Sequence, residues 1–143
     1  MKRLIALLCI VFLLGGCTKM NFKDVTPSLD AIDSIFFQRT NIDENQQYTY
    51  YEKQLTDSKE IASFCAKLDE VEFVEIEPVE FTSVDYLIVF EGKKKHKLMM
   101  SGDEIIYDGR AYKIYGSTLK NEMDALYGDL PQEESLTDSK LFK

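Results

Sequence analysis

The sequence contains no tryptophan, one histidine and three cysteines among its 143 residues. So few imidazoles and thiols leave little material for a zinc cage or a haem site. Positive charge is also scarce, because 17 lysines and arginines face 25 acidic residues and the formal net charge is −8. A general nucleic-acid-binding protein needs a cationic face to replace phosphate counterions, so this class is excluded. The length allows one domain with tails.

The motifs that usually carry catalysis are also missing. The sequence has no Gly-x-Ser-x-Gly, no CxxC, no HExxH and no glycine-rich phosphate loop. His96 lies between lysines at an expected turn, where we expect its ring to be solvated. Nucleophilic catalysis needs a base beside the nucleophile, and no such pair is indicated. We therefore expect a protein that is not an enzyme and that needs no cofactor and no metal.

One long hydrophobic run is present, near the N-terminus. Leu4 to Leu14 is an unbroken apolar segment that follows the basic pair Lys2 and Arg3. Its eleven residues are too few to cross a bilayer, which takes about 20 apolar residues. A basic start, a short apolar core and small residues at the end are typical of an export signal, which we expect to span residues 1–16.

The end of this signal, Leu14-Gly15-Gly16-Cys17, resembles the lipobox of bacterial lipoproteins. The resemblance implies cleavage after Gly16 and a diacylglycerol and palmitate anchor on Cys17. It also implies a place on the extracytoplasmic face of the cell membrane. Residues 17–29 are then expected to form the lipidated cysteine and its tether. Because Cys9 leaves with the signal, Cys65 is the one remaining thiol and no intrachain disulfide is expected.

The clearest predicted element is a helix over Asp57–Asp69. Asp57 with Glu60 has the spacing of a capping box, and the apolar residues that follow recur at the spacing of one helix face, at Ile61, Phe64, Cys65 and Leu68. This pattern predicts that Cys65 is a small buried core residue that does not react. A second helix is expected after Ser117, with Leu119, Met123 and Leu126 on one face and Gly128 at its end.

The rest of the chain favours antiparallel strands. Val84–Phe90 is apolar on both faces, which is typical of a central strand, and Asp108-Gly109 is a strong hairpin signal. The expected fold is α+β, an antiparallel β-meander sheet of five or six strands packed by two helices, in a domain of residues 30–128. Residues 129–143 are expected to be a polar C-terminal tail. The strands are predicted at 30–38, 47–53, 84–90, 96–100, 104–107 and 110–115, and 71–77 is either a short strand or an extended link.

Two clusters are candidates for contacts with other molecules. Four lysines within five residues, Lys93, Lys94, Lys95 and Lys97, are expected to project from a hairpin tip, either as a solvated turn or as a contact to an anionic surface. Three tyrosines, Tyr48, Tyr50 and Tyr51, are either core residues or a contact patch for a partner.

The part after the signal resembles small lipoproteins of low-GC Gram-positive bacteria, through Leu55–Glu60 and Tyr107–Ile114. That resemblance implies no activity. The first hypothesis is a monomeric, membrane-anchored envelope module that binds a protein or a wall polymer. The alternative is an immunity or inhibitor lipoprotein that acts against a toxin or hydrolase at the membrane surface.

Overall fold

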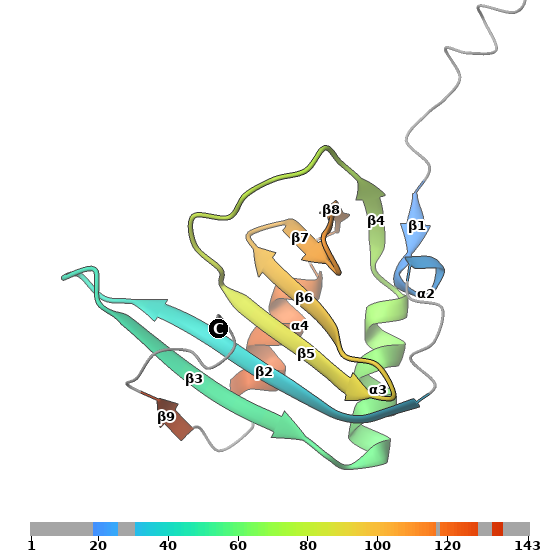
Figure 1. Cartoon of the computed structure of the whole chain (residues 1–143), viewed down its shortest axis with the longest axis horizontal. Helices are drawn as coiled ribbons and strands as arrows, with labels where there is room; N and C mark the ends of the chain where they lie inside the picture. The colour runs from blue at the N-terminus through green and yellow to red at the C-terminus, as the bar shows by residue number, and fades with distance from the viewer. Residues whose placement is uncertain (1–18, 26–30, 117, 129–132, 136–143) are drawn as a thin grey trace, which may run out of the picture.

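The computed structural model describes residues 19–25, 31–116, 118–128 and 133–135. The lipobox and Cys17 lie outside these residues. In the described part, nine strands form one antiparallel sheet in the order β1-β4-β8-β7-β6-β5-β2-β3-β9 (Figure 1). The strands are β1 (Met20–Asn21), β2 (Ile32–Ile42), β3 (Tyr48–Leu55), β4 (Glu72–Glu75), β5 (Tyr86–Gly92), β6 (His96–Ser101), β7 (Glu104–Tyr107), β8 (Arg110–Tyr115) and β9 (Glu133–Ser135). The helices are α2 (Phe22–Val25), α3 (Ser58–Asp69) and α4 (Thr118–Gly128).

The α+β class and the antiparallel meander are confirmed, but the sheet is larger than the expected five or six strands. Strands β5, β6, β7 and β8 follow one another both in the chain and in the sheet, and β2 and β3 form a hairpin beside β5. The additional strands are the short β1 and β9 at the two edges and β4 beside β8. The prediction for β5 also holds, because this strand lies inside the sheet and all five residues from Tyr86 to Phe90 are buried.

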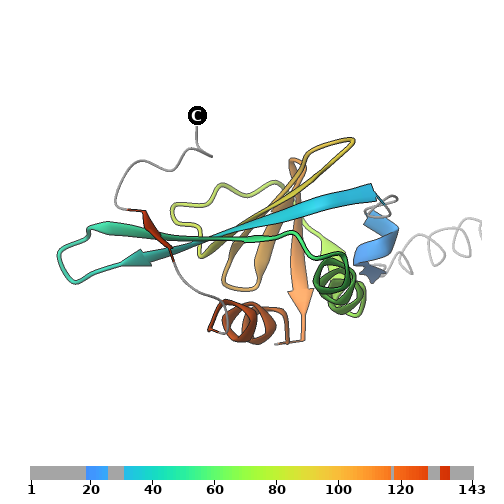
Figure 2. The ribbon, with the colours of Figure 1, turned by 90° about the horizontal axis from the view of Figure 1, so that it is seen from below.

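The core lies on the face of the sheet that the helices cover (Figure 2). On α3, the expected stripe is buried through Ile61, Phe64 and Leu68, and the Asp57 carboxylate caps the helix by accepting hydrogen bonds from the backbone N–H groups of Lys59 and Glu60. A carboxylate at this position satisfies backbone donors that have no partner within the helix. Cys65 is half-buried and packs against the core, which is less buried than the pattern predicted.

Residues 19–25, the described part of the expected tether, belong to the folded domain, which therefore begins before residue 30. Within it, β1 pairs with β4, and α2 places Phe22 in the core with 1% of its surface exposed. Phe22 contacts Phe73, Phe90 and Tyr107 at ring-centroid distances of 5.6, 6.2 and 5.4 Å. A single buried aromatic ring gives no periodic signal, so the sequence pattern did not reveal that this segment is anchored.

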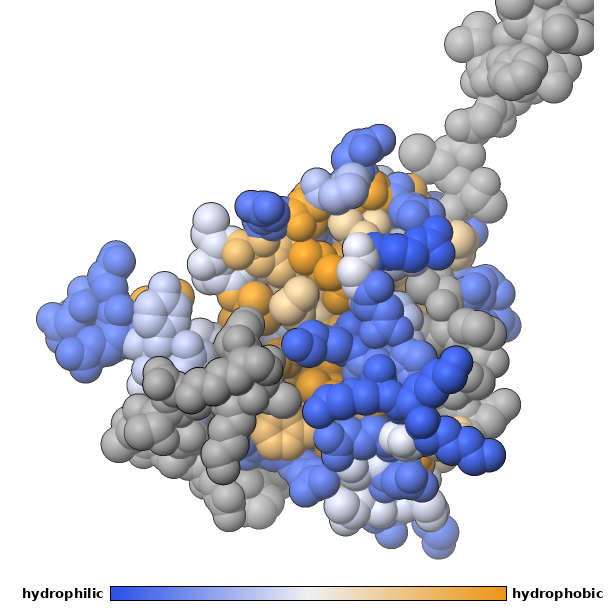
Figure 3. Space-filling view, viewed as in Figure 1, coloured by the Kyte–Doolittle hydropathy of each residue, from blue (hydrophilic) through white to orange (hydrophobic). Residues whose placement is uncertain are grey.

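The opposite face of the sheet carries no helix. Its middle is apolar, and Figure 3 shows this hydrophobic surface between polar borders. Leu87 and Val89 of β5 point to this side and are buried by their neighbours. Lys97 of β6 pairs with Val89 in the sheet register and therefore lies on the same face. Because β5 is apolar on both faces, it belongs in the interior of the sheet.

Candidate functional site

Residues 41–48, at the end of the β2–β3 hairpin, are all exposed. Strand β2 pairs with β5 only as far as Arg39, while its pairing with β3 continues to Ile42 and Tyr48. The last part of the hairpin therefore extends beyond the rest of the sheet (Figures 1 and 2). We name the segment from Ile42 to Tyr48 the hairpin tip.

Two large hydrophobic side chains are exposed at the hairpin tip. Ile42 is 45% exposed and Tyr48 is 51% exposed, and the register places these two residues directly opposite each other. Directly opposed residues in an antiparallel pair lie on the same face of the sheet. The tip therefore presents one small apolar surface on the face that has no helices.

The turn between these residues is held by one side chain. The Asp43 carboxylate accepts hydrogen bonds from the backbone N–H groups of Asn45 and Gln47, both at 2.8 Å. The Gln46 N–H donates to the Asp43 carbonyl at 3.0 Å, and Gln46 has a φ of 62°. Such local bonds fix a turn, so Ile42 and Tyr48 are presented on a defined backbone. Ordering a defined backbone on binding costs less conformational entropy than ordering a loose loop.

The three tyrosines named from the sequence do not form one cluster. Tyr48 and Tyr50 lie on the face without helices, whereas Tyr51 lies on the other face and packs against the core. The alternation of side chains along a strand separates neighbouring residues in this way. The sequence pattern missed Ile42, because the polar residues around it indicated a loop rather than the end of a long strand.

The lysine cluster is also divided. Lys93, Lys94 and Lys95 are exposed at the β5–β6 turn, but Lys97 is half-buried on β6. The Lys95 ammonium lies 3.4 Å from a Glu91 carboxylate oxygen, which reduces the positive charge at the turn. Within the described residues, Lys93 and Lys94 have no ion pair, so they are the main cations of the turn.

His96 is held in place rather than solvated as expected. Its Nδ1 lies 2.6 Å from an Asp108 carboxylate oxygen, and its ring stacks on Tyr107 at a centroid distance of 6.0 Å. In the part of the chain that the structure describes, its side chain has no hydrogen bond to a serine, threonine or cysteine. A histidine and a carboxylate without a nucleophile do not make a catalytic triad.

Cys65 is equally unsuited to catalysis. Burial raises the pKa of its thiol to about 11, and the nearby Asp69 carboxylate adds to that rise. The thiolate is the reactive form, so a raised pKa makes this cysteine a poor nucleophile.

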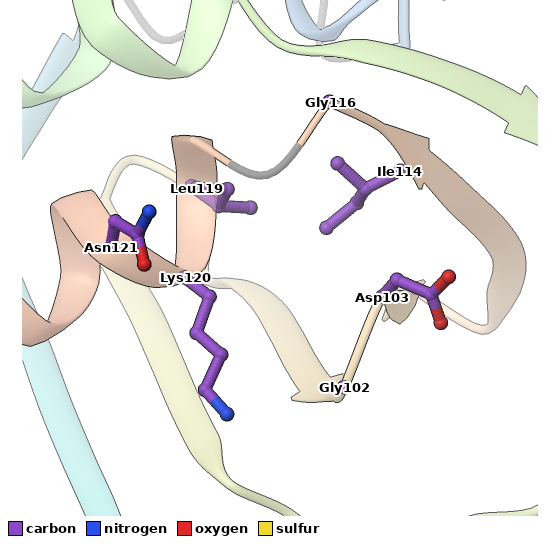
Figure 4. Close-up of a pocket in the computed structure, with 7 residues that line it drawn as sticks. All are labelled: Gly102, Asp103, Ile114, Gly116, Leu119, Lys120 and Asn121. Atoms are coloured by element: carbon purple, nitrogen blue, oxygen red, sulfur yellow. The ribbon is translucent and has the colours of Figure 1, made fainter.

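One small cavity, of about 210 Å³, lies between the β6–β7 turn and the start of α4 (Figure 4). Asp103 at its border is 3.4 Å from the Lys113 ammonium, so this carboxylate already has a partner. Sites for small ligands usually have about 300–1,000 Å³, so this hollow is small for a substrate pocket. It is lined by Gly102, Asp103, Ile114, Gly116, Leu119, Lys120 and Asn121.

The described residues contain no group of three or more His, Cys, Asp or Glu side chains arranged to hold a metal ion. Over the same residues, no helix combines the length and the apolar character needed to cross a bilayer. Comparison with protein-family models, with curated proteins and with solved structures found no match for this chain.

Proposed function

We propose that this chain is a lipid-anchored, non-enzymatic envelope module that binds a protein partner through the hairpin tip. The observation that carries this proposal is the exposed pair Ile42 and Tyr48 on a projecting hairpin whose turn is fixed by Asp43. Tyrosine is enriched among the residues that dominate binding energy at interfaces, because it supplies a large rigid contact area and one polar group.

The position of the hairpin fits an anchor on Cys17. Strand β1 lies at one edge of the sheet, and β3 lies near the opposite edge. Phe22 in the core is five residues after Cys17, a stretch that spans at most about 18 Å. Seven strand spacings of about 4.8 Å separate β1 from β3, so the path along the sheet between them is about 34 Å. An acyl chain on Cys17 would hold the β1 edge near the membrane and leave the hairpin tip away from it.

A second candidate function is an immunity or inhibitor lipoprotein. It is favoured by the exposed acidic residues Asp43 and Glu44 at the hairpin tip, together with the net charge of −8. A projecting acidic hairpin is suited to a cationic cleft on a toxin or hydrolase, because complementary charge accelerates association and favours the correct partner. Inhibition of a basic wall hydrolase by the purified chain, lost on substitution of Asp43 and Glu44, distinguishes this candidate.

The test of the proposed function is photo-crosslinking in intact cells. A benzophenone amino acid replaces Tyr48 in one variant of the full chain and Tyr115 in another. Tyr115 is a matched control, because it is 48% exposed and lies on β8, far from the hairpin in the strand order. We expect a discrete crosslinked protein from position 48 that is absent from position 115. No product at position 48, or the same product at both positions, would contradict the proposal.

A further inference from the structure

Within the described residues, the outer edge of β3 is only partly covered. Strand β3 has eight residues, but β9 pairs with three of them, Tyr50, Tyr51 and Glu52. The edge of a sheet presents backbone N–H and C=O groups that can pair with another strand. Tyr48, Tyr50 and Tyr51 are residue types that favour extended strands. The β3 edge therefore has the length and the composition needed to accept a longer strand than β9.

The pairing between β9 and β3 also opposes residues of the same charge. The register places Glu133 directly opposite Glu52, and Glu134 is the next residue of β9. Directly opposed like charges destabilise a strand pair. A strand of three residues forms few backbone hydrogen bonds to offset this cost, so we expect β9 to pair only weakly with β3.

The other edge of the sheet is covered in a different way. There β1 pairs with β4, and the Lys19 ammonium lies 2.6 Å from the Glu72 carboxylate. The chain then continues directly into Phe22, whose ring is buried in the core. This edge combines opposite charges with a hydrophobic anchor. The two edges thus differ in how strongly their last strand is held. We expect β9 at the β3 edge to be replaced by another strand more easily than β1.

We propose that the β3 edge binds an extended, basic segment of a partner protein by strand addition, and that this segment displaces β9. A lysine or arginine of the incoming strand takes the position opposite Glu52, and its neighbours on the same face pack beside Tyr48 and Tyr50. The acidic residues Asp43 and Glu44 at the hairpin tip add to the attraction for a basic strand. This proposal names the mode of contact at the β2–β3 hairpin and rests on the proposed function.

The test measures peptide binding to the full chain. The probe is a fluorescent eight-residue peptide in which lysine and valine alternate. The control peptide has the same composition except for two central prolines, which remove the N–H donors that strand addition needs. Fluorescence anisotropy gives the affinity, and hydrogen exchange of the backbone from Thr49 to Lys53 reports whether the peptide pairs with β3.

Two variants of β9 change its pairing with β3 in opposite directions. In an antiparallel pair, every second residue of a strand donates its backbone N–H to the neighbouring strand. The double variant Glu134→Pro/Ser135→Pro changes two adjacent residues, so it removes one N–H donor that faces β3. Glu133→Lys puts an opposite charge across from Glu52 and strengthens the cover. Glu80→Lys is the matched control, because it makes the same change of charge at an exposed residue between β4 and β5.

We expect the double proline variant to bind the probe peptide about three- to tenfold more tightly than the unmodified chain. Glu133→Lys should bind it about three- to tenfold more weakly, with Glu80→Lys within about twofold. The probe should slow hydrogen exchange along β3, and the proline peptide should not.

Equal affinities for the two peptides, or affinities that do not respond to the β9 substitutions, would overturn strand addition. A concentration-dependent dimer of the double proline variant with a protected β3 edge would also overturn it, because the occupant would then be a second copy. These results are separable from the proposed function. A crosslinked partner at position 48 with no peptide binding rejects only strand addition, whereas loss of the crosslink rejects the proposed function itself.

Discussion

The Asp108 carboxylate connects the start of β6 to the turn between β7 and β8. One of its oxygens lies 2.6 Å from His96 Nδ1, and the other accepts a hydrogen bond from the Lys97 N–H at 2.9 Å. Asp108 also has a φ of 46°, in the left-handed region that asparagine and aspartate tolerate better than most residues. One short acidic side chain therefore stabilises both the turn and its contact with the neighbouring strand.

Replacement of Asp108 tests this connection. Asp108→Ala removes both acceptors and puts an unsuitable residue at a positive φ, so we expect a loss of about 1–2 kcal/mol in the free energy of unfolding. Asp108→Asn keeps one acceptor oxygen and tolerates the backbone angle, so its loss should be smaller. Urea unfolding of the unmodified chain, Asp108→Ala and Asp108→Asn measures the differences in the free energy of unfolding. Equal stability of Asp108→Ala and the unmodified chain would show that these contacts contribute nothing.

Alkaline pH should destabilise the fold. Burial raises the pKa of the Cys65 thiol to about 11, and burial likewise raises the pKa values of Tyr86 and Tyr107 above their ordinary value. Between the ordinary thiol pKa of 9.0 and about 11, the unfolded chain loses its Cys65 proton while the folded chain keeps it. The free energy of unfolding therefore falls as pH rises from 9.0 to about 11. Below this range the thiol is protonated in both states and does not change the free energy of unfolding.

Urea unfolding at about pH 8 and about pH 10.5 measures this loss. Cys65→Ala removes the contribution of the thiol, so its stability should fall less between the two pH values. In a chain with Cys9→Ser and Cys17→Ser, a thiol reagent should label Cys65 slowly at about pH 8 and much faster in urea. Rapid labelling of the folded chain would contradict a protected thiol.

The elements that the sequence predicted best are those with strong local signals. The Asp57 cap and the apolar stripe of α3 indicated the helix to within one residue, and the Asp108-Gly109 turn fixed the bounds of β7 and β8. These features depend on backbone conformation and periodicity within a few residues. They could be predicted because no distant part of the chain is needed to create them.

The features that the sequence did not predict depend on distant partners. Asn41 and Ile42 extend β2 because β3 pairs with them, although Asn41 and the polar residues after Ile42 do not favour a strand on their own. Phe22 is a core residue because Phe73 and Tyr107 surround it. The hairpin tip was missed for the same reason. The exposure of the tip depends on where the rest of the sheet ends, and no local pattern reports that.

Replacement of Cys17 tests the anchor. If the resemblance to the lipobox holds, Cys17→Ser removes the only atom that can accept the diacylglycerol, and cleavage after Gly16 stops. We expect the variant to keep its signal and to have the mass of the unprocessed chain without acyl groups, while the unmodified chain enters the detergent phase of a phase-partitioning experiment with the mass of a processed, acylated protein. A variant that still enters the detergent phase at the processed mass would exclude lipidation at Cys17.

The β5–β6 turn allows a test of contact with an anionic surface. Lys93 and Lys94 are exposed, whereas Lys95 is paired with Glu91 and Lys97 is half-buried on the sheet. Each lysine close to an anionic membrane contributes about 1 kcal/mol, so Lys93 and Lys94 together would strengthen binding about thirtyfold at low salt. The measurement is co-sedimentation of the unlipidated chain without residues 1–17 with vesicles that contain an anionic phospholipid.

Within this test, the four lysines are not equivalent. Lys93→Gln/Lys94→Gln should lose most of the binding, and Lys95→Gln/Lys97→Gln is the matched control that removes the same charge with a smaller effect. Binding should also weaken as salt rises, because the Debye length falls from about 30 Å at 0.01 M to about 8 Å at 0.15 M ionic strength. If the two double variants bind as strongly as the parent chain at both salt concentrations, the turn is a solvated end of the sheet and not a contact surface.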